Sequence, residues 1–229
     1  MRYAILGTGS VGRTLAAKLS ALGHEATVGT RDVEATLART ETDRMGNAPF
    51  PQWQAEHPAV GLATFAGAAR TAQAVVCALN GLGALDALRA AGAANLAGKP
   101  LIDVSNPLDA SAGFPPRLVP VDTDSLGEQI QREFPDAKVV KTLNTMNAAV
   151  MVDPGRAGGA STVFLSGDDA DAKKAVAALL GEFGWPQASI LDLGGIETAR
   201  GAEMATGFWV RVYAALGTGD FNFHIQRAR

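Results

Sequence analysis

Three glycines near the N-terminus have the type and spacing that suit binding of a dinucleotide. They form a G-x-G-x-x-G pattern between an apolar run and a helical one, which is the context that a dinucleotide fingerprint requires. Gly7 would permit the tight turn, Gly9 would let a pyrophosphate approach, and Gly12 would let helix and strand pack closely. The helix N-terminus would present free N–H groups to the phosphates. The alternative is a purely structural turn. The predicted contacts are Gly7, Thr8, Gly9, Ser10, Val11 and Gly12.

The residues that end the second predicted strand indicate which dinucleotide is bound. NAD-specific folds usually carry an acidic residue there, about 20 residues beyond the glycines. This chain has Gly29-Thr30-Arg31 instead. A hydroxyl and a guanidinium suit a 2′-phosphate, so the sequence predicts NADP(H) held by Thr30 and Arg31. Asp32 argues against this, but it can cap a helix beginning near Val33.

The elements that must position these residues read as an α/β fold. Short runs rich in β-branched residues alternate with stretches of helical period, which is typical of βαβ units. We therefore predict a Rossmann-type, doubly wound, mostly parallel sheet with a small C-terminal α/β unit. The predicted strands are 2–6, 25–29, 60–63, 74–79, 100–104, 138–142, 162–166 and 189–192. The predicted helices span about 11–22, 33–39, 82–91, 124–133, 169–182 and 196–217.

Two glycine- and proline-rich stretches interrupt this pattern. Gly155, Gly158 and Gly159 predict a boundary between an NADP-binding domain at 1–155 and a small unit at 156–229 for substrate binding and dimerisation. Residues 43–58 contain three prolines and show no period, so they predict a surface connection. That connection is either a lid or an ordinary loop packed over the sheet edge.

Several segments spread along the chain carry a family resemblance. They are Tyr3–Gly12, Leu22–Arg31, Val139–Thr145, Gly167–Asp169 and Leu191–Gly195. Together these segments resemble the NADPH:coenzyme F420 oxidoreductase family. The resemblance implies direct hydride transfer between the nicotinamide C4 and a deazaflavin or flavin-like ring stacked over it. Orientation is then the main catalytic contribution, and no catalytic side chain is assigned.

The nicotinamide of such a fold lies outside the carboxyl ends of the strands. Those ends are Leu79-Asn80, Ser105-Asn106-Pro107 and Asn144-Thr145-Met146. The asparagines can hydrogen-bond the carboxamide or ribose, while the apolar residues can form a wall against the ring. The alternative is that the Asn-Pro pair and the last asparagine are turn and cap residues. The predicted lining is Leu79, Asn80, Asn106, Pro107, Asn144 and Met146.

The chain departs from the family pattern at the fourth predicted strand. Asn80 stands where a proline is expected, and no obvious basic cluster is present for an anionic deazaflavin tail, although Arg200, Arg211 and Arg227 can contribute. One alternative function is reduction of a small carbonyl or imine, which needs a proton donor. Another is an NADP-sensing protein without enzymatic activity.

The composition limits which classes of partner the protein can bind and indicates in which cellular compartment it works. The net charge of -3 provides no positive field for nucleic acid, and no apolar run approaches the ~20 residues that span a bilayer. The single cysteine, Cys77, fits a reducing compartment, so we expect a cytoplasmic protein. His24, His57 and His224 lack metal-ligand spacing. The expected partners are a small-molecule redox acceptor and, through the aromatic C-terminal segment, a second copy in a homodimer.

Overall fold

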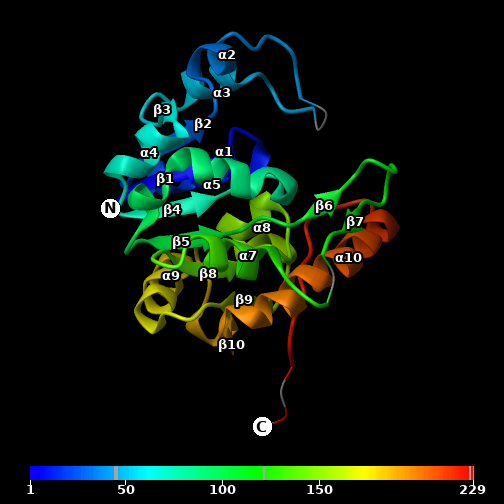
Figure 1. Ribbon diagram of the computed structural model, residues 1–229. Helices are drawn as coiled ribbons and strands as arrows, with labels where there is room; N and C mark the ends of the chain where they lie inside the picture. Colours follow the sequence, from blue (N-terminus) through cyan, green and yellow to red (C-terminus); the bar gives the residue numbers. More distant parts are fainter. Residues whose placement is uncertain (44–45, 121, 227, 229) are drawn as a thin grey trace.

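An eight-stranded sheet forms the centre of the protein in the computed structural model, which describes residues 1–43, 46–120, 122–226 and 228 (Figure 1). Arg227 of the predicted basic residues lies outside them. The strand order is β10-β9-β8-β5-β4-β1-β2-β3. The strands are β1 (Arg2–Leu6), β2 (Glu25–Thr30), β3 (Gly61–Thr64), β4 (Ala74–Cys77), β5 (Pro100–Asp103), β8 (Lys138–Thr142), β9 (Val163–Ser166) and β10 (Ile190–Gly194).

One strand pair reverses the direction of the sheet. All neighbouring strands pair in parallel except β8 and β9, which are antiparallel, with Lys141 opposite Ser166. The predicted Rossmann-type, mostly parallel sheet is therefore confirmed. The sheet continues without a break across residue 155, so the two predicted units share it, and their division into domains stays a prediction.

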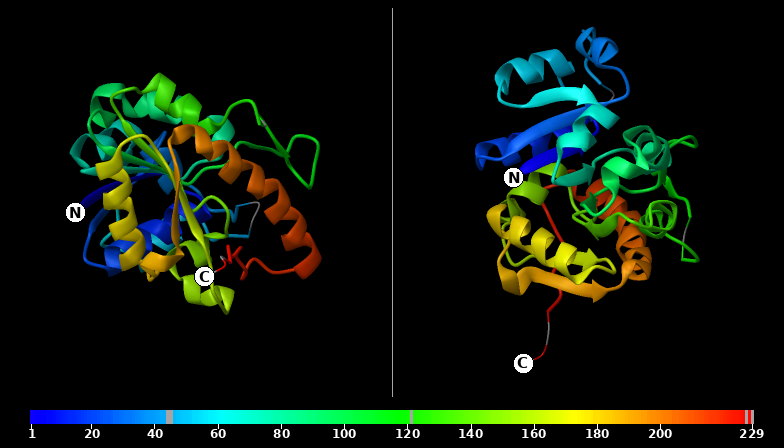
Figure 2. Two further views of the ribbon diagram at one scale, coloured as in Figure 1. Left: turned by 90° about the horizontal axis from the view of Figure 1, so that it is seen from below. Right: turned by 60° about the vertical axis from the view of Figure 1, so that its left-hand side comes forward.

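Helices cover both faces of the sheet and create two separate cores (Figure 2). Leu15, Leu19 and Val176 belong to the core under α1 (Ser10–Ala21), α8 (Ala148–Val152) and α9 (Ala170–Glu182). The other core lies under α4 (Phe65–Thr71), α5 (Ala84–Ala91), α6 (Ala93–Leu96) and α7 (Leu126–Glu133). Apolar residues on both faces of β1 are buried, as expected for a strand covered on both sides.

The expectation of a connection without regular structure at 43–58 is wrong for its second half. Residues Phe50–Glu56 form helix α3, and Phe50 is fully buried. Pro49 occupies the N-cap and Pro51 the first turn, where a missing N–H costs nothing and proline favours the helical backbone. Residues 44 and 45 of this connection lie outside the described part of the chain.

The last long helix, α10 (Ala199–Leu216), lies along one side of the sheet and ends beside a small hairpin (Figure 1). The hairpin consists of β6 (Leu108–Asp109) and β7 (Arg117–Leu118), which the sequence analysis did not predict. A short helix, α2 (Val33–Leu37), follows β2. Within the described residues, none of the helices is both long and apolar enough to cross a bilayer.

Candidate cofactor and acceptor site

The geometry of the glycine loop matches a dinucleotide cradle. Gly7 has φ +128°, and a Cβ there would lie 2.4 Å from the carbonyl oxygen of Ala78. A Cβ at Gly12 would lie 2.1 Å from the carbonyl oxygen of Gly7, so helix α1 can approach β1 only through glycine. In contrast, no atom lies within 4 Å of a Cβ built at Gly9. The loop is therefore tight where it contacts protein and open where a pyrophosphate would approach, which fits the predicted cofactor.

The N-terminus of α1 is free to bind an anion. Gly9 is its N-cap, no side chain caps it, and its first turn holds no acidic residue. Its unpaired N–H groups and partial positive charge favour phosphate. Arg13 Nε, one turn further on, donates to the carbonyl oxygen of Thr8 at 2.8 Å and fixes the loop from behind.

A cleft of about 490 Å³ opens in front of this loop. Its walls come from the glycine loop, the carboxyl ends of β4, β5 and β8, and one face of α10. The lining residues are Gly9, Ser10, Val11, Ala78, Leu79, Asn80, Val104, Ser105, Asn106, Leu108, Asn144, Met146, Met151, Thr206, Trp209 and Val210. The strand-end residues predicted from sequence thus meet in one place. Pro107 does not line the cleft, because it begins the hairpin and its carbonyl oxygen accepts from Val119 N at 3.0 Å.

The end of β2 holds the residues predicted to bind the 2′-phosphate. Arg31 is exposed, whereas Thr30 is buried and its hydroxyl pairs with that of Thr36 at 2.8 Å. Asp32 accepts from Ala35 N at 2.9 Å, which confirms that it caps α2. Arg31 therefore has its guanidinium available, and phosphate binding by Thr30 and Arg31 stays a prediction.

A second arginine, which was not predicted from the sequence, lies close to the same loop. Arg39 Nη1 donates to the hydroxyl of Thr8 at 3.0 Å, and Thr8 follows β1, the strand next to β2. Arg39 thus brings another positive charge to the edge where Arg31 lies. Its position at the end of the predicted helix 33–39 is the only sequence signal that points to it.

Arg13 also anchors α3 to the body of the protein. Its Nη1 donates to the carbonyl oxygen of Ala48, and its guanidinium lies 5.4 Å from the ring centre of Phe50 and 6.0 Å from that of Trp53. Burial lowers the pKa of Arg13, although an arginine stays charged at any physiological pH. The contacts tie α3 to α1, so the described part of residues 43–58 from Ala48 onward packs against the body of the protein, and a lid role for it stays a prediction.

Behind the cleft lies a buried ionic cluster that the sequence analysis also missed. Lys141 Nζ is 2.7 Å from Asp103 Oδ2 and donates to the carbonyl oxygen of Ser105 at 2.8 Å. Asp103 Oδ1 accepts from both the backbone N and the hydroxyl of Ser105. The cluster fixes the backbone at the carboxyl end of β5, and it therefore also positions Ser105, which lines the cleft.

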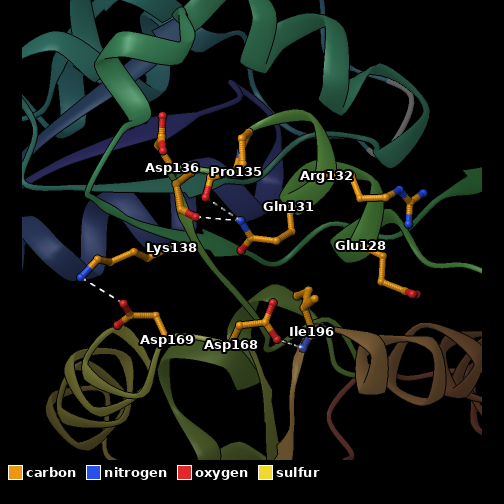
Figure 3. Close-up of a pocket in the computed structure, with 10 residues that line it drawn as sticks. Glu128, Gln131, Arg132, Pro135, Asp136, Lys138, Asp168, Asp169 and Ile196 are labelled. Atoms are coloured by element: carbon orange, nitrogen blue, oxygen red, sulfur yellow. Dashed lines mark hydrogen bonds and ion pairs between the residues drawn. The ribbon is translucent and has the colours of Figure 1, made fainter.

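A second, larger hollow of about 710 Å³ lies at the opposite edge of the sheet (Figure 3). It surrounds Lys138 at the start of β8, far from the carboxyl ends that form the cofactor cleft. Two ion pairs lie at this hollow: Lys138 with Asp169 at 3.1 Å and Glu128 with Arg200 at 2.6 Å. Arg200 is therefore paired at this end of the sheet and is not among the residues that line the cofactor cleft.

Comparison with known proteins assigns this site to a family. Residues 2–107 match the family described as "NADP oxidoreductase coenzyme F420-dependent". A solved structure of a provisionally assigned F420-dependent NADP-reductase from Arthrobacter sp. FB24 is 60% identical, with a TM-score of 0.93, and covers 99% of this chain and 100% of that one. The chain belongs to the F420-dependent NADP oxidoreductase family. This oxidoreductase accordingly uses NADP(H), as the glycine loop and the end of β2 predict.

More distant relatives share parts of the same architecture. The SMa0349 protein of Sinorhizobium meliloti is 27% identical with a TM-score of 0.62, and the match covers 86% of this oxidoreductase and 87% of that chain. The rat protein metalloreductase STEAP3 is 28% identical over 202 residues, which are 88% of this oxidoreductase. The matched region is 36% of STEAP3, so the chain spans about a third of the length of that relative.

Proposed function

We propose that this oxidoreductase transfers a hydride between NADPH and a deazaflavin acceptor such as coenzyme F420. One observation carries the proposal: among the described residues, those that line the cleft include no carboxyl, imidazole, ammonium, thiol or phenol group. Reduction of a carbonyl or imine needs a proton donor beside the hydride site. Hydride transfer between two flat rings needs mainly their correct placement. The cleft is therefore suited to the second reaction.

Different residues position different parts of the cofactor and the acceptor. The glycine loop and α1 bind the pyrophosphate, and Arg31 with Arg39 gives the edge of β2 a charge suited to a 2′-phosphate. Leu79, Met146 and Trp209 provide apolar surface that excludes water from the reacting rings. NADPH, when bound, supplies the hydride, and no side chain has to accept or donate a proton at the reacting carbon.

Two further features support the setting of this reaction. Cys77 is fully buried and burial strongly raises the pKa of its thiol, so it acts as a core residue and not as a nucleophile. A single unpaired thiol suits a cytoplasmic enzyme. Among the described residues no group of three or more potential ligands could hold a metal ion.

An acceptor panel tests the proposal. The enzyme is mixed anaerobically with NADPH and, separately, with coenzyme F420, FMN, FAD, a quinone, a small ketone and a cyclic imine, and the visible or near-ultraviolet spectrum is followed. We expect the highest kcat/KM with the deazaflavin. A higher kcat/KM with the ketone or imine, together with no reduction of any ring acceptor, would refute the proposal. Preference for a flavin would replace the deazaflavin and retain the ring-to-ring chemistry.

A further inference from the structure

We propose that Asn106 presents one amide N–H to the cofactor cleft and binds a carbonyl oxygen there, either of the nicotinamide carboxamide or of the acceptor ring. Its neighbours Asn144 and Thr206 act as positioning residues for that donor. If the carbonyl belongs to the acceptor ring, the inference rests on the proposed function. If it belongs to the nicotinamide carboxamide, the inference requires only that NADP(H) binds.

Asn144 is the fixed end of this arrangement. Its Nδ2 donates to the carbonyl oxygen of Ala202 in α10 and to Asn106 Oδ1, both at 2.9 Å. A backbone carbonyl can only accept a hydrogen bond, so the side-chain amide of Asn144 can have only this orientation. Both of its amide hydrogens are used within the protein. Asn144 therefore cannot donate a side-chain hydrogen bond to the cofactor.

The orientation of Asn106 follows from that of Asn144. Asn106 Nδ2 donates to the carbonyl oxygen of Asn144 at 2.7 Å, and Asn106 Oδ1 accepts from Asn144 Nδ2. Turning the amide over would bring two acceptors together at one contact and two donors together at the other. Thr206 adds a hydroxyl that donates to Asn106 Oδ1 at 2.8 Å.

Counting donors and acceptors leaves one group free. Asn106 Oδ1 has two lone pairs, and both are occupied, by Asn144 and by Thr206. Asn106 Nδ2 has two hydrogens, of which one is used, and within the described residues the other has no partner. Asn106 is half-buried and lines the cleft. It can therefore serve a ligand only as a donor, and the matching group is a carbonyl oxygen.

This arrangement also distinguishes among ligands. A carboxamide or a ring carbonyl at this position gains a hydrogen bond, whereas an amine or ammonium group would face a donor. Thr206 comes from α10 and Asn144 follows β8, so the donor is held by residues of two different elements that line the cleft. Loss of the Thr206 hydroxyl should loosen the donor without removing it.

Calorimetric titration with NADPH and with 2′,5′-ADP, which lacks the nicotinamide, tests the proposal. Asn106→Ala should weaken NADPH binding about 2- to 12-fold, the range expected for one neutral hydrogen bond, and leave 2′,5′-ADP binding unchanged. Thr206→Val should weaken NADPH binding by less, and Thr206→Ser should restore it. Asn95→Ala, which removes a remote amide bonded to the carbonyl oxygen of Ala91, is the matched control and should change neither affinity.

The outcomes separate the two carbonyl sources from each other and from a structural role. Unchanged NADPH binding with a raised KM for the ring acceptor would assign the donor to the acceptor and still support the proposal. Equal losses for NADPH and 2′,5′-ADP, or no change in either affinity or in KM, would overturn it. If Asn106→Ala does not fold, the Thr206 pair decides: no difference between Val and Ser also overturns it. Absence of F420 turnover would refute the proposed function and leave the NADPH titration intact.

Discussion

The Lys141 ammonium lies 2.8 Å from the Glu203 carboxylate, and both side chains are closed to solvent. Glu203 also accepts from the backbone N of Leu126 and of Gly127, at 2.9 and 3.0 Å. Those N–H groups begin α7, whose partial positive charge helps to stabilise the Glu203 carboxylate. Lys141 also pairs with a second buried carboxylate, that of Asp103. Burial lowers the pKa of Lys141, but the two carboxylates outweigh it and the net pKa is raised. One ammonium thus joins β5, β8 and α10.

Removal of this ammonium should strongly destabilise the fold. Lys141→Met leaves two buried carboxylates without their cation, and breaking a buried pair costs about 3–5 kcal/mol. Lys138→Met is the matched control, because the side chains of Lys138 and its partner Asp169 are 37% and 33% exposed and a surface pair is worth about 0–1 kcal/mol. Urea unfolding measures both free energies. Equal losses in the two variants would show that the buried cluster contributes no more than a surface pair.

Arg31 should determine the preference for NADPH over NADH. Charge-assisted hydrogen bonds are worth about 1.5–3 kcal/mol, so Arg31→Ala should weaken NADPH binding roughly 10- to 150-fold. NADH binding should change little, since NADH has no 2′-phosphate. Arg70→Ala removes an exposed arginine at the end of α4 and should affect neither cofactor. Calorimetry that finds equal losses for NADPH and NADH would place the 2′-phosphate elsewhere.

The histidines should be dispensable for turnover. His24 pairs with Glu182 at 2.8 Å, His57 stacks on Trp53, and His224 lies beside Thr162, and none of them lines the cleft. His24→Ala, His57→Ala and His224→Ala should each retain most of the NADPH-dependent rate. A loss of ~100-fold in one folded variant would indicate general acid–base catalysis and favour carbonyl reduction.

We predict that the enzyme forms a homodimer through its C-terminal part. Phe208 and Leu216 of α10 are 63% and 57% exposed, and Phe114 near the hairpin is 67% exposed. Neighbouring exposed apolar side chains of this size favour association. Light scattering at micromolar concentration should give twice the monomer mass. Phe208→Glu with Leu216→Glu should shift that mass to the monomer, and a wild-type monomer would contradict the prediction.

Acid should weaken the contact that begins α7. Hydrogen bonds from Arg132 lower the pKa of Asp124 from 3.8 to about 2. A carboxylate with a depressed pKa stabilises the folded state above its unfolded pKa and loses that contribution as the pH falls through the folded value. Stability should therefore fall between about pH 4 and pH 2, and less steeply in Asp124→Asn. Thermal unfolding across this range would show identical slopes if the contact contributed nothing.

The sequence predicts the first βαβ unit well because its signals are local. β1, α1 and β2 begin and end within one residue of the predicted bounds, since apolar period and glycine positions both mark them. Helix α4 was missed because its sequence, Phe-Ala-Gly-Ala-Ala-Arg-Thr, has one large apolar side chain and no clear period. Lys141 was missed for a different reason. It lies in an apolar strand, and its partner Glu203 belongs to a helix far away in the sequence, so the ion pair can be recognised only in the folded structure.

Because β9 runs antiparallel to β8, the segment that follows β10 must be long enough to return to the carboxyl end of β8. The chain leaves β10 at the amino edge of β8, where Ile196 lies beside Lys138, and it must reach Asn106 and Asn144 at the other edge. The first part of α10 covers that distance, because Thr206 follows Ala199 by seven residues, about 10 Å along the helix axis. Each inserted or deleted residue would rotate Thr206 by about 100° relative to Glu203. Homologous proteins should therefore tolerate substitutions on the exposed side of α10 more readily than an insertion or deletion between Glu203 and Thr206.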